Sequence, residues 1–297
     1  MIQRTRGEKI FNVFNYIILI VLGLTTVYPL LYTFTISVSK IADATRPGLH
    51  LLPDFTDMTF QAYKLAFQNP EVISAYGWTI WRAVVGTVLG LIVTCFYGYA
   101  LSRPNLMWKK FFSGYLMFTM IFSGGQIPTY LNIKSLGLLD NVWVYVLPCL
   151  ISAYNTVVAK SFFVGIPEAL NESARIDGAG EFRTFFQIIV PLSKPIVMTL
   201  ALWMAVMHWN SWFDSMLYMD SNSGKIVIQQ YIRRIVLEND TASMTDFGKD
   251  TSTMTKDYTS ETVKSASIMV TVLPILLFYP FVQRFFIKGV TLGAVKG

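Results

Sequence analysis

Three charged residues at helical spacing, Glu168, Glu172 and Arg175, are the side chains best placed for specific polar contacts. Residues three or four positions apart lie on one face of a helix, so Glu168 shares a face with Glu172, and Glu172 can pair with Arg175. The same spacing puts Leu170 and Ala174 on an apolar ridge. A charged helix with an apolar ridge, set between apolar segments, predicts insertion into a groove on another protein. A solvated helix without a partner is the alternative.

The sequence marks both ends of this short helix. Pro167 suits the first helical position, because its missing N–H would have no partner there. Glu168 complements the positive end of the helix dipole. Arg175 falls in the last turn, and Gly178 is expected to adopt the left-handed conformation that ends a helix. We therefore predict a helix from Pro167 to Asp177.

The chain lacks the motifs of common catalytic and nucleotide-binding sites. It has no P-loop, no HExxH or CxxC motif and no Ser-His-Asp arrangement. Its only histidines, His50 and His208, are too few for a His-rich metal site, and Cys95 and Cys149 lie within apolar segments as packing residues. We expect no catalytic residue, metal site or cofactor in this chain, so any energy that its function needs must come from a partner.

The composition is that of a membrane protein. Of 297 residues, 53% are hydrophobic and 14% are charged, and the mean hydropathy is +0.47. A soluble domain carries about 25% charged residues. The net charge of +6 raises the question of nucleic-acid binding. The basic residues do not form a stripe with interleaved aromatics, so no nucleic-acid partner is expected. The fold class predicted is all-α, a polytopic membrane protein with one transmembrane domain over residues 1–297.

Six apolar segments are long enough to cross a bilayer. The expected spans are residues 11–38, 76–101, 111–131, 142–163, 192–217 and 264–287. The first is too long for the apolar core of a cleaved signal peptide, about 7–15 residues, and Pro29 is expected to kink it. A short amphipathic helix at 60–67 is expected either to lie along the membrane surface or to be a simple loop helix.

Several residues inside the spans have a specific role. Gly86 and Gly90 form a G-x-x-x-G pair that permits close helix approach. Arg82 lies near the outer end of its span, where its side chain is expected to extend to the interface. The run 124–130, with two glycines and a proline, predicts an irregular end of the third span.

Charge distribution predicts the orientation of the chain. The terminal segments, residues 102–110 and the predicted helix at 167–178 lie on one side of the membrane, where basic residues outnumber acidic ones by more than two to one. Cytoplasmic segments carry the excess of Lys and Arg. Both termini and the 167–178 helix are therefore expected in the cytoplasm of a bacterial cell, and the polar loop 218–263 outside.

The sequence around the helix resembles a known motif. Glu172–Ala174 is followed by three residues, Gly178, nine residues and then Ile188–Pro191. This pattern resembles the EAA motif of binding-protein-dependent ABC importer permeases, with Ser173 and Val190 in place of Ala and Leu. The preceding and following residues resemble the carbohydrate branch of that family, and the resemblance extends from the first span to the end of the chain.

The resemblance implies a type I ABC importer permease fold and a set of partners. These are a second homologous permease, two ATPase subunits that bind ATP and Mg, an extracellular solute-binding protein, a carbohydrate substrate and the lipid bilayer. The helix at 167–178 would be the coupling helix that docks in the ATPase. The residues implied in coupling are Glu168, Ala169, Leu170, Glu172, Ser173, Ala174, Arg175, Asp177 and Gly178.

Two further segments are assigned by the same resemblance. The cytoplasmic tail, residues 288–297, resembles that of the maltose-permease branch, where it enters the ATPase dimer; a frayed terminus is the alternative. The loop 218–263 would dock the binding protein, or else be merely disordered.

Residues 122–130 and 208–211 resemble the branch that imports larger oligosaccharides. The candidate substrate-pathway residues are Gln126, Tyr130, Trp203, His208, Trp209 and Asn210. Sugar rings stack on aromatic side chains, but Trp and Tyr also form interfacial belts. An importer of peptides or amino acids, or a secondary transporter, remains the alternative function.

Overall fold

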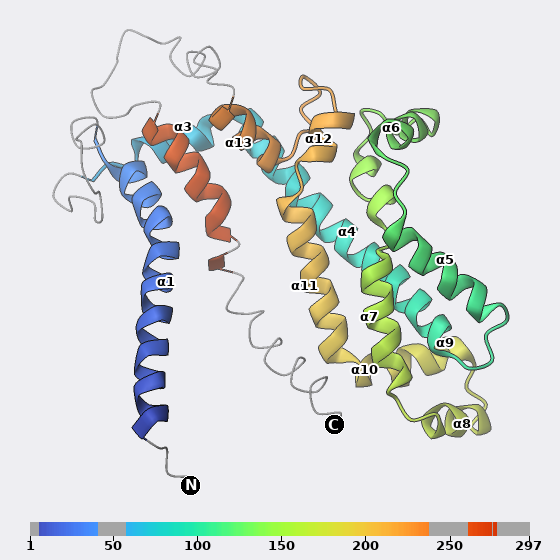
Figure 1. Cartoon of the computed structure of the whole chain (residues 1–297). Coiled ribbons are helices and arrows are strands. Elements are labelled where there is room, and N and C mark those ends of the chain that lie inside the picture. Colours follow the sequence, from blue (N-terminus) through green and yellow to red (C-terminus); the bar gives the residue numbers. More distant parts are fainter. Residues whose placement is uncertain (1–5, 41–57, 238–260, 275, 278–297) are drawn as a thin grey trace. The chain divides into compact units, whose positions relative to one another are not determined.

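The computed structural model describes residues 6–40, 58–237, 261–274 and 276–277 (Figure 1). The described residues form helices and connecting turns, with no strand among them, so the all-α prediction is confirmed. Predictions for the tail 288–297, for the end of the sixth span and for much of the loop 218–263 lie outside the described residues. The chain divides into two compact units, one made of Met1–Val72 with Ile232–Pro274 and the other of Ile73–Tyr231 with Ile275–Gly297.

The first unit contains the N-terminal span, helix α1 (Arg6–Val38). Over residues 7–38 its most apolar stretch is unburied, as expected for a helix that faces lipid or another subunit. Helix α3 (Gln61–Gln68) confirms the predicted short helix at 60–67. Its buried Ala62 packs against Val263 and Ala266 of the helix at 261–274, so its apolar side contacts this chain.

The second unit is a bundle built around helix α4 (Pro70–Ser102), whose residues from 73 onward belong to it. The other elements follow in chain order: α5 (Lys109–Ile121), α6 (Gln126–Ser135), η1 (Val142–Tyr145), η2 (Leu147–Cys149), α7 (Ala153–Val164), α8 (Ala169–Ile176), α9 (Glu181–Thr184), the π-turn η3 (Phe185–Ile189), α10 (Val190–Leu192), α11 (Lys194–Asn210) and α12 (Phe213–Tyr218). Helix α13 (Ile228–Leu237) begins in this unit. Figure 1 shows α6 and α12 at one end of the bundle and α8 and α9 at the other.

The predicted span 142–163 is a broken helix, and a second bend lies at the start of the predicted span 192–217. The run Val142–Cys149 meets Ala153–Val164 at 48°, and Glu181–Leu192 meets Lys194–Asn210 at 85°. Proline explains both breaks, because Pro148 and Pro195 cannot donate the backbone hydrogen bond that continues a helix. Two described helices are long and apolar enough to cross a membrane, or four if each bent pair is one span. The number six stays a prediction.

The third predicted span ends irregularly, as its glycines indicate. Helix α5 has 13 residues and stops at Ile121, and α6 starts only at Gln126. Gly125 between them has φ +86°, a backbone conformation open to glycine. At about 1.5 Å per residue, α5 alone measures roughly 20 Å, which is shorter than the ~30 Å hydrocarbon core.

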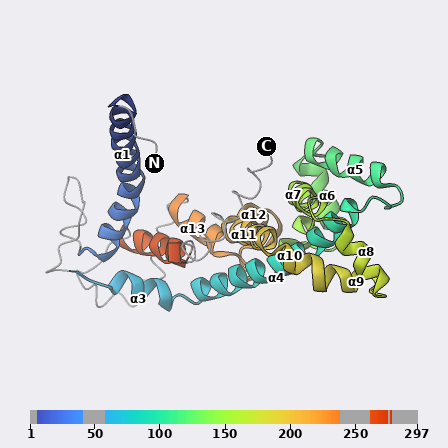
Figure 2. The same ribbon diagram turned by 90° about the horizontal axis from the view of Figure 1, so that it is seen from below.

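Glycines let α4 contact its neighbours closely. A Cβ at Gly86 would lie 2.3 Å from Nε2 of His208 in α11, and one at Gly90 would lie 3.4 Å from Sδ of Met204. The predicted close approach at this pair is therefore confirmed, and α11 is the partner helix. Gly98, which the sequence did not single out, continues the same face: a Cβ there would lie 2.8 Å from Cβ of Ala159 in α7. In Figure 2, α4 runs along one side of this bundle.

Candidate coupling site

Helix α8 ends as the sequence predicts. Gly178 has φ +76°, and the N–H of Ala179 donates to the carbonyl of Ala174 at 2.8 Å. The N–H of Gly178 donates to the carbonyl of Arg175 at 3.0 Å. These two bonds are those of a Schellman motif, which satisfies carbonyls that the helix end would otherwise leave unpaired. The glycine cap turns the chain sharply towards α9.

The start of α8 differs from the prediction. The helix begins at Ala169 with Glu168 as the preceding cap residue, so Pro167 lies outside it. A residue that precedes the helix by two positions needs no helical conformation. The helix is therefore shorter by two residues at its start and by one at its end than the range Pro167–Asp177.

The burial of α8 corrects the predicted apolar ridge. Ala174 is only 4% exposed and Asn171 2%, so these two side chains face the rest of this chain. Leu170 is 38% exposed and Ile176 is 85% exposed. The apolar side chains accessible to another protein are therefore Leu170 and Ile176. The remaining predicted coupling residues are exposed on the outside of α8 and its ends: Glu168, Ala169, Glu172, Ser173, Arg175, Asp177 and Gly178.

A network of ion pairs ties the two ends of α8 to α4. Arg103, one residue beyond α4, places Nη1 3.0 Å from Oε2 of Glu168 and Nε 3.9 Å from Oε2 of Glu181. The Arg103 guanidinium also lies over the ring of Tyr99, 4.9 Å from its centroid. Tyr99 donates a hydrogen bond from its hydroxyl to Glu181 Oε2 at 2.9 Å. One arginine thus joins α4 to the residues just before and just after α8.

The predicted pair of Glu172 and Arg175 does not form. Arg175 instead places Nη2 2.8 Å from Oε1 of Glu181. Helical spacing indicated only the partner one turn away, whereas the Gly178 turn brings Glu181 back beside Arg175. Glu172 is exposed and keeps its carboxylate available for a contact outside this chain.

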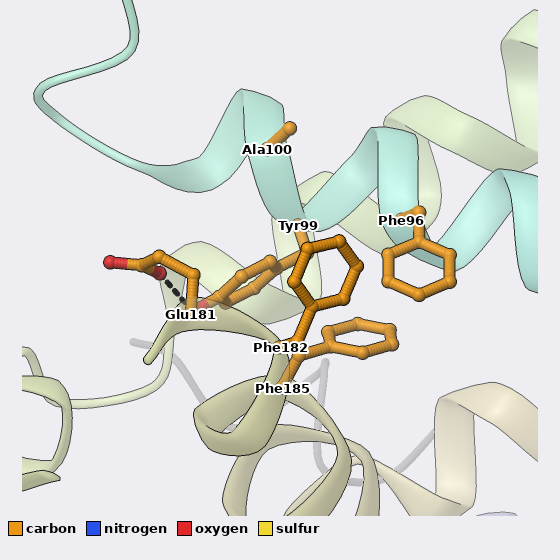
Figure 3. A pocket seen from close by; sticks show the side chains of 6 residues that line it. All are labelled: Phe96, Tyr99, Ala100, Glu181, Phe182 and Phe185. Atoms are coloured by element: carbon orange, nitrogen blue, oxygen red, sulfur yellow. Dashed lines mark hydrogen bonds between the residues drawn. The ribbon is translucent and has the colours of Figure 1, made fainter. Parts of the chain in front are cut away.

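An apolar hollow lies beside this network (Figure 3). Its volume is about 210 Å³. It is lined by Phe96, Tyr99, Ala100, Glu181, Phe182 and Phe185. The rings of Phe96 and Phe185 stack at 4.6 Å, and Phe182 is 73% exposed. The α8 end of the bundle therefore presents aromatic surface next to charged groups.

The predicted substrate-pathway residues lie on two helices, α6 and α11. Tyr130 of α6 stacks on Tyr218 with ring centroids 6.1 Å apart, and Trp203 of α11 packs on Tyr154 at 5.9 Å. Asn210 donates to the carbonyl of Val206 in its own helix at 2.9 Å. None of these contacts tests a role in transport, which stays a prediction.

The three remaining pathway candidates lie in different surroundings. Gln126 is exposed at the start of α6, and Trp209 is half-buried in α11. His208 is 2% exposed and packs against α4, where Arg82 Nε lies 3.4 Å from its Nδ1. His208 therefore contributes to the α4–α11 contact, and its role in the substrate pathway stays a prediction.

Arg82 is a structural residue whose side-chain environment differs from the prediction. It is 0% exposed rather than extended to the interface. Both terminal nitrogens bind the carboxylate of Asp214 in α12, with Nη1 2.9 Å from Oδ1. Nη1 also donates to the carbonyl of Ser211, and the guanidinium lies 4.9 Å from the ring centroid of Tyr145. The sequence did contain a signal for this pair, because Arg82 and Asp214 lie near the outer ends of two predicted spans and carry opposite charges.

A second ion pair lies at the α12 end. Lys225 Nζ is 2.9 Å from Oδ2 of Asp140 and 2.8 Å from its carbonyl oxygen. The hydrogen bond from Lys225 lowers the pKa of Asp140 below its usual value. The N–H of Asp140 also donates to the carbonyl of Tyr218 at 2.8 Å, so Asp140 holds the segment after α12 from both sides.

This pair predicts a pH-dependent contribution to stability. A lowered folded-state pKa means that the contribution is present above the unfolded value, ~3.9, and is lost as the pH falls through the folded value. Both side chains are partly exposed, so the effect is small. We expect the Tm of the wild type to exceed that of Asp140→Asn at pH 6, and the difference to shrink as the pH is lowered below about 4. Asn keeps the left-handed conformation of this residue, φ 50°. An equal difference at pH 6 and at the lower pH values would contradict the assignment.

Comparison with known proteins gives the family. Residues 104–292 match the family described as "Binding-protein-dependent transport system inner membrane component". Protein LplC of Bacillus subtilis (strain 168) is 37% identical over 297 residues, which cover 99% of this chain and 98% of the relative. The polygalacturonan/rhamnogalacturonan transport system permease protein YtcP of the same organism is 35% identical over 292 residues, 98% of this chain and 99% of its own.

A solved structure supports the fold over nearly the whole chain. It is the crystal structure of a bacterial ABC transporter involved in the import of the acidic polysaccharide alginate. One of its chains matches with a TM-score of 0.87 and 31% identity, covering 96% of this chain and 100% of that one. The resemblance noted at the EAA-like motif thus extends to the three-dimensional structure. The chain belongs to the family of binding-protein-dependent transport system inner membrane components, and is a multi-pass membrane subunit of such a system.

Proposed function

We propose that this chain is one permease subunit of an ATP-driven importer of carbohydrates, and that acidic oligosaccharides are its substrate class. The observation that carries the proposal is the end-to-end match to two proteins whose names concern acidic polysaccharides. One is the polygalacturonan/rhamnogalacturonan permease and the other belongs to the alginate importer. A shared fold alone does not give a substrate, but identity of 31–35% over 96–98% of this chain is closer than a shared fold.

The proposed source of energy is a partner ATPase that binds ATP and Mg. This chain has no P-loop, so it has no such nucleotide site of its own. Helix α8 is the proposed coupling helix, because it exposes charged and apolar side chains together. Glu172 and Ile176 would contact the ATPase, while Arg103 and Glu181 hold the helix against α4. Docking of a charged, exposed surface favours polar contacts that can form and release in each cycle.

The proposed assembly contains a second homologous permease, two ATPase subunits and an extracellular solute-binding protein. The family description names a binding protein, which supports that last partner. The excess of basic residues beside α8 supports a cytoplasmic position for α8 and for both termini. The loop 218–263 would then face the binding protein, and the tail 288–297 would approach the ATPase.

Purification and uptake test this assembly directly. The detergent-extracted chain should carry ATPase subunits and a second permease with it. Proteoliposomes of the complex should take up labelled oligosaccharides cut from polygalacturonan or alginate, and only with ATP and the binding protein. Uptake of a peptide or amino acid instead would show that acidic oligosaccharides are not the substrate class. Transport without any ATPase would overturn the proposal.

Reversing the charge of Glu172 should uncouple ATP hydrolysis from uptake. Glu172 is exposed and the ion pairs around α8 use other residues, so Glu172→Lys leaves the contacts of this chain intact. A like charge placed against a docking surface costs several kcal/mol, so we expect oligosaccharide uptake to fall at least about tenfold. Folding and membrane insertion should not change. The measurement is uptake and ATP hydrolysis in the same proteoliposomes.

Two further variants serve as controls for this charge reversal. Glu172→Gln removes the charge without reversing it and should have a smaller effect. Glu261→Lys makes the same reversal at an exposed residue of the helix at 261–274, which belongs to the other compact unit, and should keep wild-type uptake. Wild-type uptake in Glu172→Lys would exclude the coupling role.

A further inference from the structure

We propose that α4 is the rigid link between the two ends of this subunit, with Arg103 and Arg82 as the positioning residues that fasten it at each end. The inference rests on the proposed function, because it assigns to α4 the transmission of movement from the coupling helix α8 to α12. Arg103 holds α4 to α8 at one end, which we call the α8 end. Arg82 holds α4 to α12 at the other, the α12 end.

The α8 end of α4 is fastened through a shared set of charges. Arg103 binds Glu168 before α8 and Glu181 after it, and Tyr99 donates a hydrogen bond to the same Glu181. Lys109 Nζ donates to the carbonyl of Arg103 at 2.9 Å, which holds this arginine in place from α5. A displacement of α8 therefore pulls on α4 through charge-assisted bonds at both ends of α8.

The α12 end of α4 is fastened by a buried network. Arg82 binds the Asp214 carboxylate with two nitrogens, and Ser211 accepts a third contact. One turn earlier in α4, Thr79 Oγ1 accepts a hydrogen bond from the N–H of Ile228 at 2.9 Å. Arg82 is fully buried, so this contact cannot exchange with water.

Neighbouring side chains extend the α12-end network to the segment after α12. Ser74 Oγ and Trp78 Nε1 both donate to the carbonyl of Gly224, at 2.6 and 3.0 Å. The Tyr145 hydroxyl lies 2.8 Å from Ser215 Oγ and 2.8 Å from the carbonyl of Lys225. The segment from 211 to 228 is thus bound to one face of α4 and to η1.

The two fastenings lie a membrane thickness apart. Arg82 and Arg103 are twenty-one positions apart, which is about 31 Å at ~1.5 Å per residue of helix. The hydrocarbon core of a bilayer is about 30 Å thick. One arginine therefore lies near each surface of the membrane, and the helix between them covers the apolar part.

The continuity of α4 makes it the element able to transmit force. Among the described helices of its unit, α4 is the only one that is long enough to cross the membrane without a break. Helices α7 and α11 have 12 and 17 residues and meet the runs before them at 48° and 85°, and α5 stops short of α6. A bend absorbs displacement, whereas an unbroken helix moves as one body. Gly86 and Gly98 keep α4 in close contact with α11 and α7, so movement of α4 reaches both neighbours.

A double-mutant cycle on ATP hydrolysis tests the link. The variants are Arg82→Lys, Arg103→Lys and the combination, in the purified complex with its ATPase. Lys keeps the charge at each position but loses the fork that binds two groups. When two sites this far apart are independent, the effects of their substitutions on a rate multiply to within about twofold. We expect each single variant to change the rate of ATP hydrolysis, and the combination to depart from the product of the two effects by at least about threefold.

A matched control uses Arg183→Lys combined with Arg82→Lys. Arg183 lies at the α8 end, and its Nε donates to Gln187 Oε1 at 2.9 Å, a contact that does not involve α4. The effects of these two substitutions on the rate of ATP hydrolysis should multiply. A multiplicative result for Arg82 with Arg103, or wild-type hydrolysis in either of those single variants, overturns the role of α4. If the wild-type complex shows no ATP-dependent uptake, the proposed function itself fails, so the two outcomes are distinguishable.

Discussion

Arg82→Ala should destabilise the folded protein by about 3–5 kcal/mol, the range found when one partner of a buried ion pair is removed. The substitution leaves the carboxylate of Asp214, which is 15% exposed, without its bidentate partner. It also removes the cation that lies over Tyr145 and the donor to the carbonyl of Ser211. We expect a large loss of folded protein in detergent extracts and a Tm lowered by several degrees or more, measured at a fixed scan rate.

A volume-conserving double variant separates charge from packing. Arg82→Met with Asp214→Leu removes both charges together, and such apolar replacements of buried pairs are often neutral or stabilising. This variant should therefore recover most of the stability that Arg82→Ala loses. If the single variant keeps the wild-type Tm, the pair is not a structural contact. If the double variant is no better than the single one, packing around the guanidinium carries the effect.

Gly98→Val should separate α4 from α7. A Cβ at this position would lie 2.8 Å from Cβ of Ala159 and 3.1 Å from the backbone nitrogen of Lys160. Backbone cannot move aside as a flexible side chain can, so the helices must part or shift. We expect a loss of about 1–3 kcal/mol or more, the cost of overpacking a close-packed contact. The measurement is the Tm of the solubilised protein together with the amount inserted in the membrane.

Gly77→Val in the same helix is the matched control for overpacking. A Cβ at Gly77 meets nothing within 4 Å, so the same change adds no clash there. Val is a better helix residue than Gly, so Gly77→Val should be neutral or slightly stabilising. Equal destabilisation at both positions would show that the α4–α7 contact does not decide the result.

Local features of the fold could be predicted from the sequence because short-range rules govern them. The Gly178 cap depends on one residue without a Cβ, and the break before Gln126 depends on two glycines and a proline. The EAA-like pattern around Gly178 was specific enough to indicate the family, which the comparisons confirm. The start of α8 was predicted two residues too early, because a proline can lie just before a helix as well as at its first position.

The partners of the charged residues could not be predicted, because they are distant in sequence. Arg82 and Asp214 are 132 positions apart, and Arg103 and Glu168 are 65 apart. Helical spacing identifies only neighbours one turn away, so it predicted Glu172 as the partner of Arg175. The true partner, Glu181, follows a turn that the helix rule does not extend across. The burial of Ala174 likewise depends on how α8 packs against the rest of the chain and not on the helix itself.

The separation of Arg82 from Asp214 also constrains how the protein is made. An arginine stays charged under all physiological conditions, so α4 cannot lose that charge when it leaves the ribosome. Its partner is synthesised 132 residues later, and a lone guanidinium is costly inside a bilayer. Until α12 has been translated, the Arg82 guanidinium has no Asp214 carboxylate to bind, and water or lipid headgroups near the membrane surface must stabilise its charge. Chains truncated before Asp214 would therefore lack the ion pair that joins α4 to α12.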